Sequence, residues 1–124
     1  ALNCILAQRL VRVLCPRCKH PVTYAPAQLV ESGLDPDRHG SHVFYEAAGC
    51  PECHGTGYHG RTAIMELLEL SDPIRELILE RKPLSEVRKR AKSEGMVFIR
   101  EIGVGKVLEG KTSLKELNKV TFVE

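Results

Sequence analysis

Four of the five cysteines form two pairs with the same spacing. Two residues separate Cys15 from Cys18 and Cys50 from Cys53, and a proline follows the first cysteine of each pair. A two-residue gap lets one tight turn direct both sulfur atoms at a single point, and proline favours such a turn. Two such turns supply the four thiolates that surround a tetrahedral Zn²⁺ ion. The spacing therefore predicts a structural zinc site.

Other uses of these cysteines have less support. Disulfide bonds need an oxidising compartment, whereas residues 1–12 predict no signal peptide and favour a cytoplasmic protein. A thioredoxin-like redox site needs one C-x-x-C pair in a βαβ unit, and a catalytic zinc ion keeps an open position that four thiolates would close. We therefore expect zinc to hold together a loop-rich β region whose own core is too small to stabilise it.

The remaining cysteine and the histidines predict no second site. Cys4 falls on an apolar stripe between Leu2 and Ile5, so we expect a buried and inert thiol. His20 and His54 lie next to the cysteine pairs, where they could replace a ligand or donate to a thiolate, although exposed loop histidines are the commoner case. The sequence contains no other combination of side chains that predicts a catalytic centre.

One segment matches the phosphate-loop pattern G-x-x-x-x-G-K-[ST] through four residues: Gly105, Gly110, Lys111 and Thr112. The pattern binds phosphate only where a buried strand precedes it and a helix follows. Residues 100–104 are too few and too polar for that strand, and residues 106–109 favour a helix. We interpret the match as a coincidence in which Gly110 ends one helix and Ser113 opens the next, and we predict no cofactor-binding residue here.

The elements around the cysteines are predicted to be a helix, a β region and a run of short helices. Apolar residues at helical spacing predict an amphipathic helix over residues 1–14: Leu2, Ile5, Leu6, Leu10, Val13 and Leu14. Residues 42–46 and 61–70 have strand composition, and residues 35–37 favour a turn. Further helices are predicted over residues 26–32, from Asp72, over 85–94 and 97–109, and from the capping box of Ser113.

Length, composition and charge restrict the remaining possibilities. The 124 residues suffice for one domain or two small lobes, and the apolar (43%) and charged (27%) fractions are those of a globular protein. Four thiolates and one Zn²⁺ bring the formal net charge of +2 to zero, so we expect no nucleic-acid partner. No apolar run approaches the ~20 residues that span a bilayer. The chain lacks an initiator Met and is expected to be a fragment.

Several motifs resemble one family in combination. Residues 49–61 read G-C-P-E-C-H-G-T-G-Y-H-G-R, residues 65–68 read M-E-L-L, and residues 6–12 read L-A-Q-R-L-V-R. Residues 95–96 and the pattern G-x-x-K-V-x-x-G-x-T-S over residues 103–113 continue the likeness. Together they resemble the C-terminal part of the ATPases of type II secretion, whose ATPase is the E subunit, and of type IV pilus assembly. The likeness extends from Leu6 to Thr121.

The resemblance implies that the parent is a hexameric cytoplasmic P-loop ATPase at the inner membrane. Its ATP and magnesium sites would lie upstream, so the fragment alone should be inactive. Its partners would be the upstream nucleotide-binding domain, neighbouring subunits and inner-membrane platform proteins, without a membrane span of its own. The implied division is a helix over residues 1–14 continuing from the ATPase core, a zinc subdomain over 15–70 and a helical subdomain over 71–124. The predicted fold class is α+β.

Three functional assignments follow. The sequence of residues 62–68, T-A-I-M-E-L-L, favours type II secretion, with type IV pilus assembly as the alternative. A different class is a zinc-ribbon-type protein-interaction module, which the pattern C-x-x-C-x-G-x-G over residues 50–57 suggests. Arg9 and Arg12 fit either a nucleotide or subunit contact, as the resemblance implies, or a solvated helix face. The sequence does not identify the membrane partner.

Overall fold

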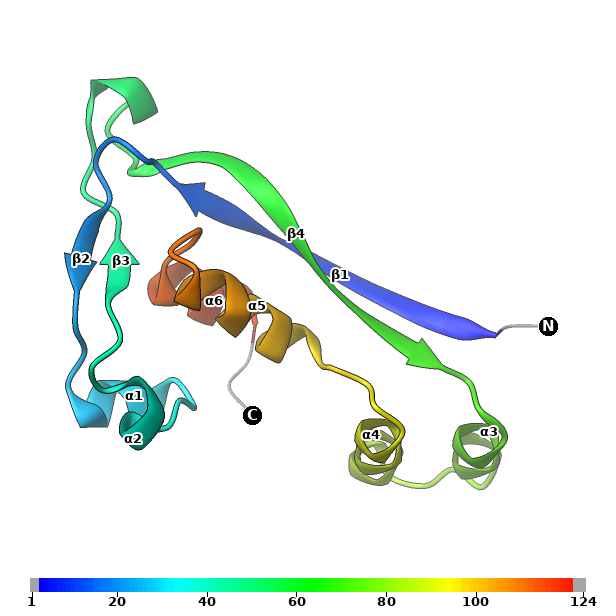
Figure 1. Ribbon diagram of the computed structural model, residues 1–124. Helices are drawn as coiled ribbons and strands as arrows, with labels where there is room; N and C mark the ends of the chain where they lie inside the picture. Colours follow the sequence, from blue (N-terminus) through cyan, green and yellow to red (C-terminus); the bar gives the residue numbers. More distant parts are fainter. Residues whose placement is uncertain (1–2, 122–124) are drawn as a thin grey trace.

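A long antiparallel ribbon of two strands, β1 (Cys4–Leu14) and β4 (Tyr58–Glu69), connects the two ends of the fold (Figure 1). The computed structural model describes residues 3–121. Cys4 lies opposite Glu69 at one end of the ribbon, and Leu14 lies opposite Tyr58 at the other, after an irregularity that follows Arg12. The two strands therefore end next to the cysteine pairs.

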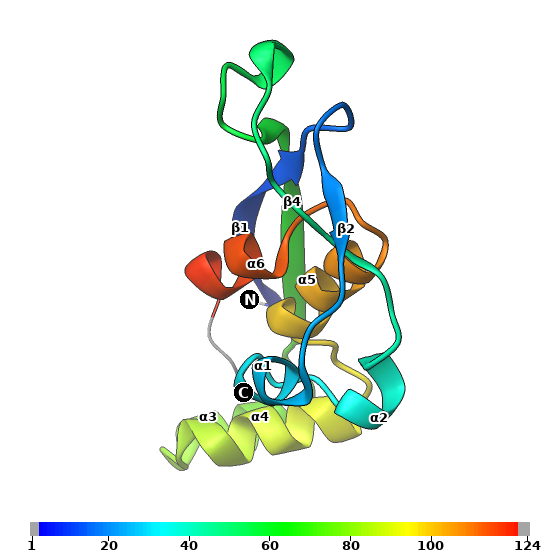
Figure 2. The ribbon, with the colours of Figure 1, turned by 90° about the vertical axis from the view of Figure 1, so that its left-hand side faces the viewer.

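Some of the other elements lie between β1 and β4 in the sequence, and the rest follow β4. Between β1 and β4 lie β2 (His20–Val22), α1 (Pro26–Glu31), α2 (Pro36–His39), β3 (Phe44–Glu46) and the 3₁₀ helix η1 (Pro51–Cys53). After β4 come α3 (Asp72–Leu79), α4 (Leu84–Ser93), α5 (Ile99–Leu108) and α6 (Leu114–Val120). β2 pairs with β3, with α1 and α2 at the far end of that hairpin from η1 (Figure 2). This arrangement confirms the predicted α+β class.

The predicted helix over residues 1–14 is wrong, because residues 4–14 form strand β1. Ile5 and Val11 lie on one face of the strand, and Leu6 and Leu10 lie on the other. A strand with apolar residues on both faces loses the alternation by which strands are identified, and its spacing can then imitate a helix. Leu2, which the prediction included, lies outside the described residues.

The remaining predicted elements agree with the structure to within a few residues, with two corrections, whereas the short strand β2 was not predicted. We expected Asp72 to be the N-cap of the helix that starts there, but the N-cap of α3 is Ser71, whose hydroxyl accepts a hydrogen bond from the N–H of Ile74. Residues 36–39 form the short helix α2, capped by Asp35, where we predicted only a turn. The predicted strands correspond to β3 and β4. Boundaries of short helices commonly differ by a residue or two.

The main core lies between the ribbon and α5 and α6. Its buried members come from the ribbon, α1, β3, α5 and α6 and from the segment after α1: Val11, Leu29, Leu34, Phe44, Ile64, Val107, Leu114 and Leu117. A second, smaller cluster joins α3 and α4 through Ile74, Val87 and Ala91. The division into subdomains over residues 15–70 and 71–124 stays a prediction. None of the helices in residues 3–121 combines the length and apolar character of a membrane span.

Gly103 allows α5 to approach its neighbours closely. A Cβ atom at this position would overlap Cδ1 of Leu117 in α6 and would come within 3.3 Å of Cδ1 of Ile64 in β4. Both of those side chains are fully buried, so they have little room to move away. Gly105, two residues later in the same helix, would place its Cβ in open space.

This difference gives a matched pair of substitutions. We expect Gly103→Ala to lower the free energy of unfolding by about 1–3 kcal/mol, because it overfills the core. Gly105→Ala should raise it by about 0.5–1 kcal/mol, because alanine favours a helix over glycine. Urea denaturation of the two variants beside the wild type measures both changes. Equal effects of the two substitutions would contradict this packing.

Candidate metal centre

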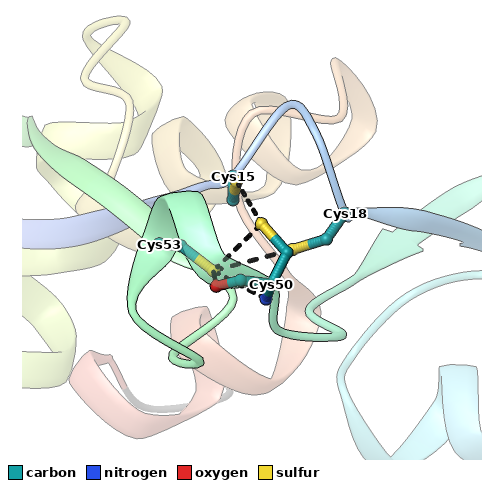
Figure 3. A group of neighbouring side chains, drawn as sticks. All are labelled: Cys15, Cys18, Cys50 and Cys53. Carbon is teal, nitrogen blue, oxygen red and sulfur yellow. Dashed lines mark hydrogen bonds between the residues drawn. The ribbon is translucent and has the colours of Figure 1, made fainter.

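The four cysteines of the two predicted pairs converge at the end of the ribbon (Figure 3). All four Sγ atoms lie within 4.8 Å of one another. Sγ of Cys50 lies 3.8 Å from that of Cys15 and 3.7 Å from that of Cys53, and the Cys18–Cys53 pair is 3.8 Å apart. Four sulfurs at about 2.3 Å from a tetrahedral Zn²⁺ lie about 3.8 Å from one another. The cluster therefore has the dimensions of a four-thiolate zinc shell.

Two different local structures place the two pairs. Cys15 directly follows β1, and the turn that contains Cys18 is closed by the N–H of Lys19 donating to the Cys15 carbonyl at 3.0 Å. The 3₁₀ helix η1 begins after Cys50 and ends with Cys53, with a proline at its first position. Each turn brings its two sulfur atoms to the same side, as the spacing predicted.

Gly57 connects the two pairs through its backbone. Its N–H donates to Sγ of Cys53 at 3.1 Å, and its carbonyl accepts from the N–H of Cys15 at 2.9 Å. Its φ of +82° lies in the region that favours glycine, and a Cβ there would overlap the Cβ of Ala47. This role was not predicted from the sequence, although the C-x-x-C-x-G-x-G pattern that begins at Cys50 contains the residue.

Backbone donors around the sulfurs favour the thiolate form that a metal needs. Sγ of Cys18 accepts from the N–H of Gly49 at 3.3 Å, and Sγ of Cys53 accepts from the N–H of Cys50 at 3.2 Å. Burial opposes ionisation of Cys53, but the N–H groups of Cys50 and Gly57, together with the neighbouring sulfurs of Cys50 and Cys18, outweigh it and lower its pKa to about 6. This acidity is what a zinc-binding thiol requires at neutral pH.

Cys50 behaves differently from Cys53 as long as no cation is bound. The backbone N–H of Cys53 favours the Cys50 thiolate, but burial and the neighbouring sulfurs of Cys53 and Cys15 outweigh it and raise its pKa to about 11. Crowded sulfurs cannot all carry negative charge without a cation between them. The donor set thus fits a divalent soft metal, and four thiolates leave no open position for a reacting water.

The other candidate residues lie outside this cluster. His20 and His54 are exposed, and the metal-binding group found among residues 3–121 contains only the four cysteines. Cys4 is exposed rather than buried, so that prediction is wrong. The reason is the strand itself, which places Cys4 at the uncovered end of the ribbon instead of on the buried face of a helix.

The residues of the phosphate-loop match lie at the junction of α5 and α6. Gly105 lies inside α5, and Gly110 follows its end with a φ of +77°. Thr112 is fully buried, and its hydroxyl donates to the carbonyl of Arg12 at 2.7 Å. Lys111 forms an ion pair with Glu109 at 3.2 Å. The element before Gly110 is therefore a helix and not a strand.

This junction also contacts the chain beside the metal centre. The N–H of Leu14 donates to the carbonyl of Lys111 at 2.8 Å, and Nζ of Lys19 donates to the carbonyl of Gly110 at 3.0 Å. Both donors flank the first cysteine pair. The helices that follow β4 therefore contact the turn that carries two of the four sulfurs, a contact that the sequence did not predict.

Arg12 strengthens the same junction. Its guanidinium donates to Glu116 of α6 at 3.0 Å, its backbone N–H donates to the same carboxylate at 2.8 Å, and it stacks on Tyr58. Burial opposes ionisation of Glu116, but these bonds outweigh it and lower the pKa of Glu116. The carboxylate that we expected to complete a capping box with Ser113 thus binds Arg12 instead.

Comparison with known proteins identifies the family. The family model described as "Type II/IV secretion system protein" matches residues 1–119. The chain belongs to this family. The resemblance inferred from the motifs around the cysteines is therefore confirmed.

Individual members of the type II/IV secretion system family match almost the whole chain. It is 44% identical over 120 residues to the type II secretion system protein E of Pseudomonas aeruginosa, covering 97% of this chain and 23% of that protein. It is 40% identical over 118 residues to the type IV pilus assembly ATPase PilB of Myxococcus xanthus, covering 94% and 21%. The type II secretion system ATPase E of Vibrio cholerae is 40% identical, with 94% and 23% covered. The chain spans less than a quarter of each relative.

The metal centre makes a direct prediction about zinc content. We expect one zinc per chain in the wild type and in Cys4→Ser, because Cys4 lies outside the cluster. Cys53→Ser should weaken zinc binding by more than the roughly 10–100-fold that loss of an outer hydrogen-bond partner costs. Atomic emission analysis after dialysis against a weak chelator measures the three contents. Equal zinc in Cys53→Ser and Cys4→Ser would show that the cluster is not the site.

Proposed function

We propose that this chain is the zinc-binding region of a hexameric motor ATPase that powers type II protein secretion through the bacterial inner membrane. The observation that carries the proposal is the 44% identity, over 97% of the chain, to a protein named type II secretion system protein E. ATP and magnesium bind in the parent protein, outside these residues. The chain itself contributes a metal-stabilised structural unit and no catalytic residue.

In this proposal Cys15, Cys18, Cys50 and Cys53 hold a structural zinc ion. Zinc supplies a fixed tetrahedral link between two segments that 31 residues separate in the sequence. The N–H groups of Gly49 and Gly57 orient the thiolates and reduce their charge density. The observed sulfur–sulfur distances and the closed donor set support zinc in a structural role.

Type IV pilus assembly is the second candidate for the same region. The relatives named type IV pilus assembly ATPase PilB from Myxococcus xanthus and Thermus thermophilus are 40% and 42% identical to this chain. These identities are close to those of the secretion proteins. Both candidates place the parent in the cytoplasm at the inner membrane, with neighbouring subunits of a hexamer and membrane platform proteins as partners.

ATP hydrolysis tests whether the catalytic residues lie outside this chain. We expect the parent protein to hydrolyse ATP and the chain of residues 1–124 to bind zinc without hydrolysing ATP, because none of its described residues forms a phosphate-binding loop after a strand. A coupled assay of phosphate release, with zinc content measured on the same samples, compares the two. Hydrolysis by the isolated chain at the parent's rate would contradict the proposal.

Complementation separates the two candidate pathways. In a host strain that lacks the parent gene, restoring the gene should restore release of secreted proteins into the medium if the parent serves type II secretion. Restored surface pili with unchanged secretion would instead assign the parent to pilus assembly.

A further inference from the structure

A cleft of about 490 Å³ runs along one face of α5, from Arg100 in the first turn of the helix to Leu108 at its end. The turn after α1, helix α2 and the last turn of α4 supply the other walls. In Figure 1, α1 and α2 lie below α5 to the left, and α4 lies below it to the right. We call this space the α5 cleft. Its volume is usual for a site that binds a small molecule.

Positively charged side chains line the α5 cleft from three different helices. Arg38 belongs to α2, Lys92 to α4 and Arg100 to α5. Of the described residues that line the cleft, Glu101 alone is acidic. With His39 neutral, the lining residues therefore carry an excess of two positive charges. A concave site with one predominant sign of charge attracts ligands of the opposite sign.

Hydrogen bonds fix two walls of the cleft to α5. Arg100 is only 5% exposed, and its Nη2 donates to the carbonyl of Ser32 at 2.6 Å, which joins α5 to the turn after α1. Nε2 of His42 donates to the carbonyl of Leu108 at 2.9 Å, which joins the end of α5 to the segment after α2. The walls are thus held in place before a ligand binds, which lowers the entropy lost on binding.

The surface of α5 inside the cleft is apolar and partly bare. Val104 and Leu108 line it, and Leu34 faces them from the turn after α1. Gly105 lies between them on α5, and a Cβ atom there would meet no protein atom within 4 Å. The missing side chain leaves room for a ligand beside the helix. Small-molecule sites commonly combine such an apolar lining with a few charged groups that orient the ligand.

We propose that the α5 cleft binds a soluble organic phosphate, with the phosphate group between Arg38 and Lys92 and the apolar part of the molecule along α5. A phosphate monoester carries a charge of about −1.5 to −2 at neutral pH, which matches the excess of two positive charges, whereas a carboxylate carries only one. Arginine and lysine are the usual phosphate-binding side chains. This site goes beyond the proposed function, in which ATP binds outside these residues.

The proposed site is different from a phosphate loop. Of the four residues in the phosphate-loop match, Gly105 lines the cleft, and it contributes only the space that its missing side chain leaves. Gly110, Lys111 and Thr112 follow the end of α5, where the Thr112 hydroxyl is already bound to the carbonyl of Arg12. Recognition would come from side chains of separate helices and not from a loop of backbone N–H groups.

A phosphate in this position would link two parts of the fold. Arg38 belongs to the segment between the two cysteine pairs, whereas Lys92 belongs to α4, which packs with α3 in the second, smaller cluster. A ligand that contacts both side chains binds only while the two parts keep their relative position. It would therefore stabilise that position.

Acetylation of Lys92 in the parent protein tests the proposal. Phenyl phosphate is the probe, and phenyl sulfate, which has the same shape and a single charge, is the control ligand. The acetylation rate of Lys92 with an N-hydroxysuccinimide ester is followed by mass spectrometry and divided by that of Lys82, which lies in the α3–α4 turn. The probe is used at about 20 mM, above the millimolar Kd expected for so small a ligand. We expect it to slow acetylation of Lys92 about fivefold, because an anion beside the amine favours the charged ammonium, which does not react.

Three variants locate the bound probe. Gly105→Leu fills the cleft from a position where a Cβ meets no protein atom, and Arg38→Glu reverses one charge of its lining. Both should abolish the protection of Lys92. Lys89→Glu makes a matched change of charge one turn earlier in α4, at an exposed position outside the cleft lining, and should keep the protection. The zinc content of each variant serves as the folding check.

Several outcomes would overturn the proposal. Acetylation of Lys92 that phenyl phosphate does not slow would reject the site, and equal protection by phenyl sulfate would reject its selectivity for a dianion. Protection that survives in both Gly105→Leu and Arg38→Glu would place the probe outside the cleft. Protection by vesicles of phosphatidic acid but not by phenyl phosphate would assign the phosphate to a lipid headgroup and overturn the soluble ligand. None of these results depends on ATP hydrolysis by the parent, so the proposed function is tested separately.

Discussion

The convergence of four sulfur atoms at one point is the constraint on which this fold depends. Cys15 and Cys18 follow one strand of the ribbon, and Cys50 and Cys53 precede the other. A metal ion between them would close a loop that contains β2, β3 and two short helices, none of which has more than six residues. Elements of that size seldom support themselves by burial alone. A metal ion bound there would therefore fix where β4 begins relative to the end of β1.

Residues beside the cysteine cluster also contact the helices that follow the ribbon. Hydrogen bonds from Leu14 and Lys19 reach the α5–α6 junction, and Arg12 binds Glu116 in α6. These contacts begin within three residues of the first cysteine pair. From the sequence we expected a zinc unit followed by separate helices. In the structure, a common core and the polar contacts beside the cluster join the two parts. In this arrangement, a structural metal ion bound by the cysteines would affect the whole region.

The sequence predicted the convergence of the four cysteines better than it predicted the first element. The ligand spacing is a local property of two turns, so Cys15, Cys18, Cys50 and Cys53 could be identified without knowledge of the fold. β1 could not, because Leu6 and Leu10 on its outer face and Val11 on its inner face produce a pattern that fits a helix equally well. The role of Gly57 and the bond between Arg12 and Glu116 depend on residues distant in the sequence. Such contacts appear only when the chain is folded.

Hydrogen–deuterium exchange of the zinc-loaded chain, before and after chelation, tests the central claim most directly. The account predicts faster exchange at the amides of Gly49, Gly57 and Leu14 and at the α5–α6 junction, because their hydrogen bonds depend on the position of the cluster. The α3–α4 pair has its own small cluster and should keep its protection, which makes it an internal control. Unchanged exchange around the cysteines and the junction after complete removal of zinc would contradict the claim that the metal holds this region together.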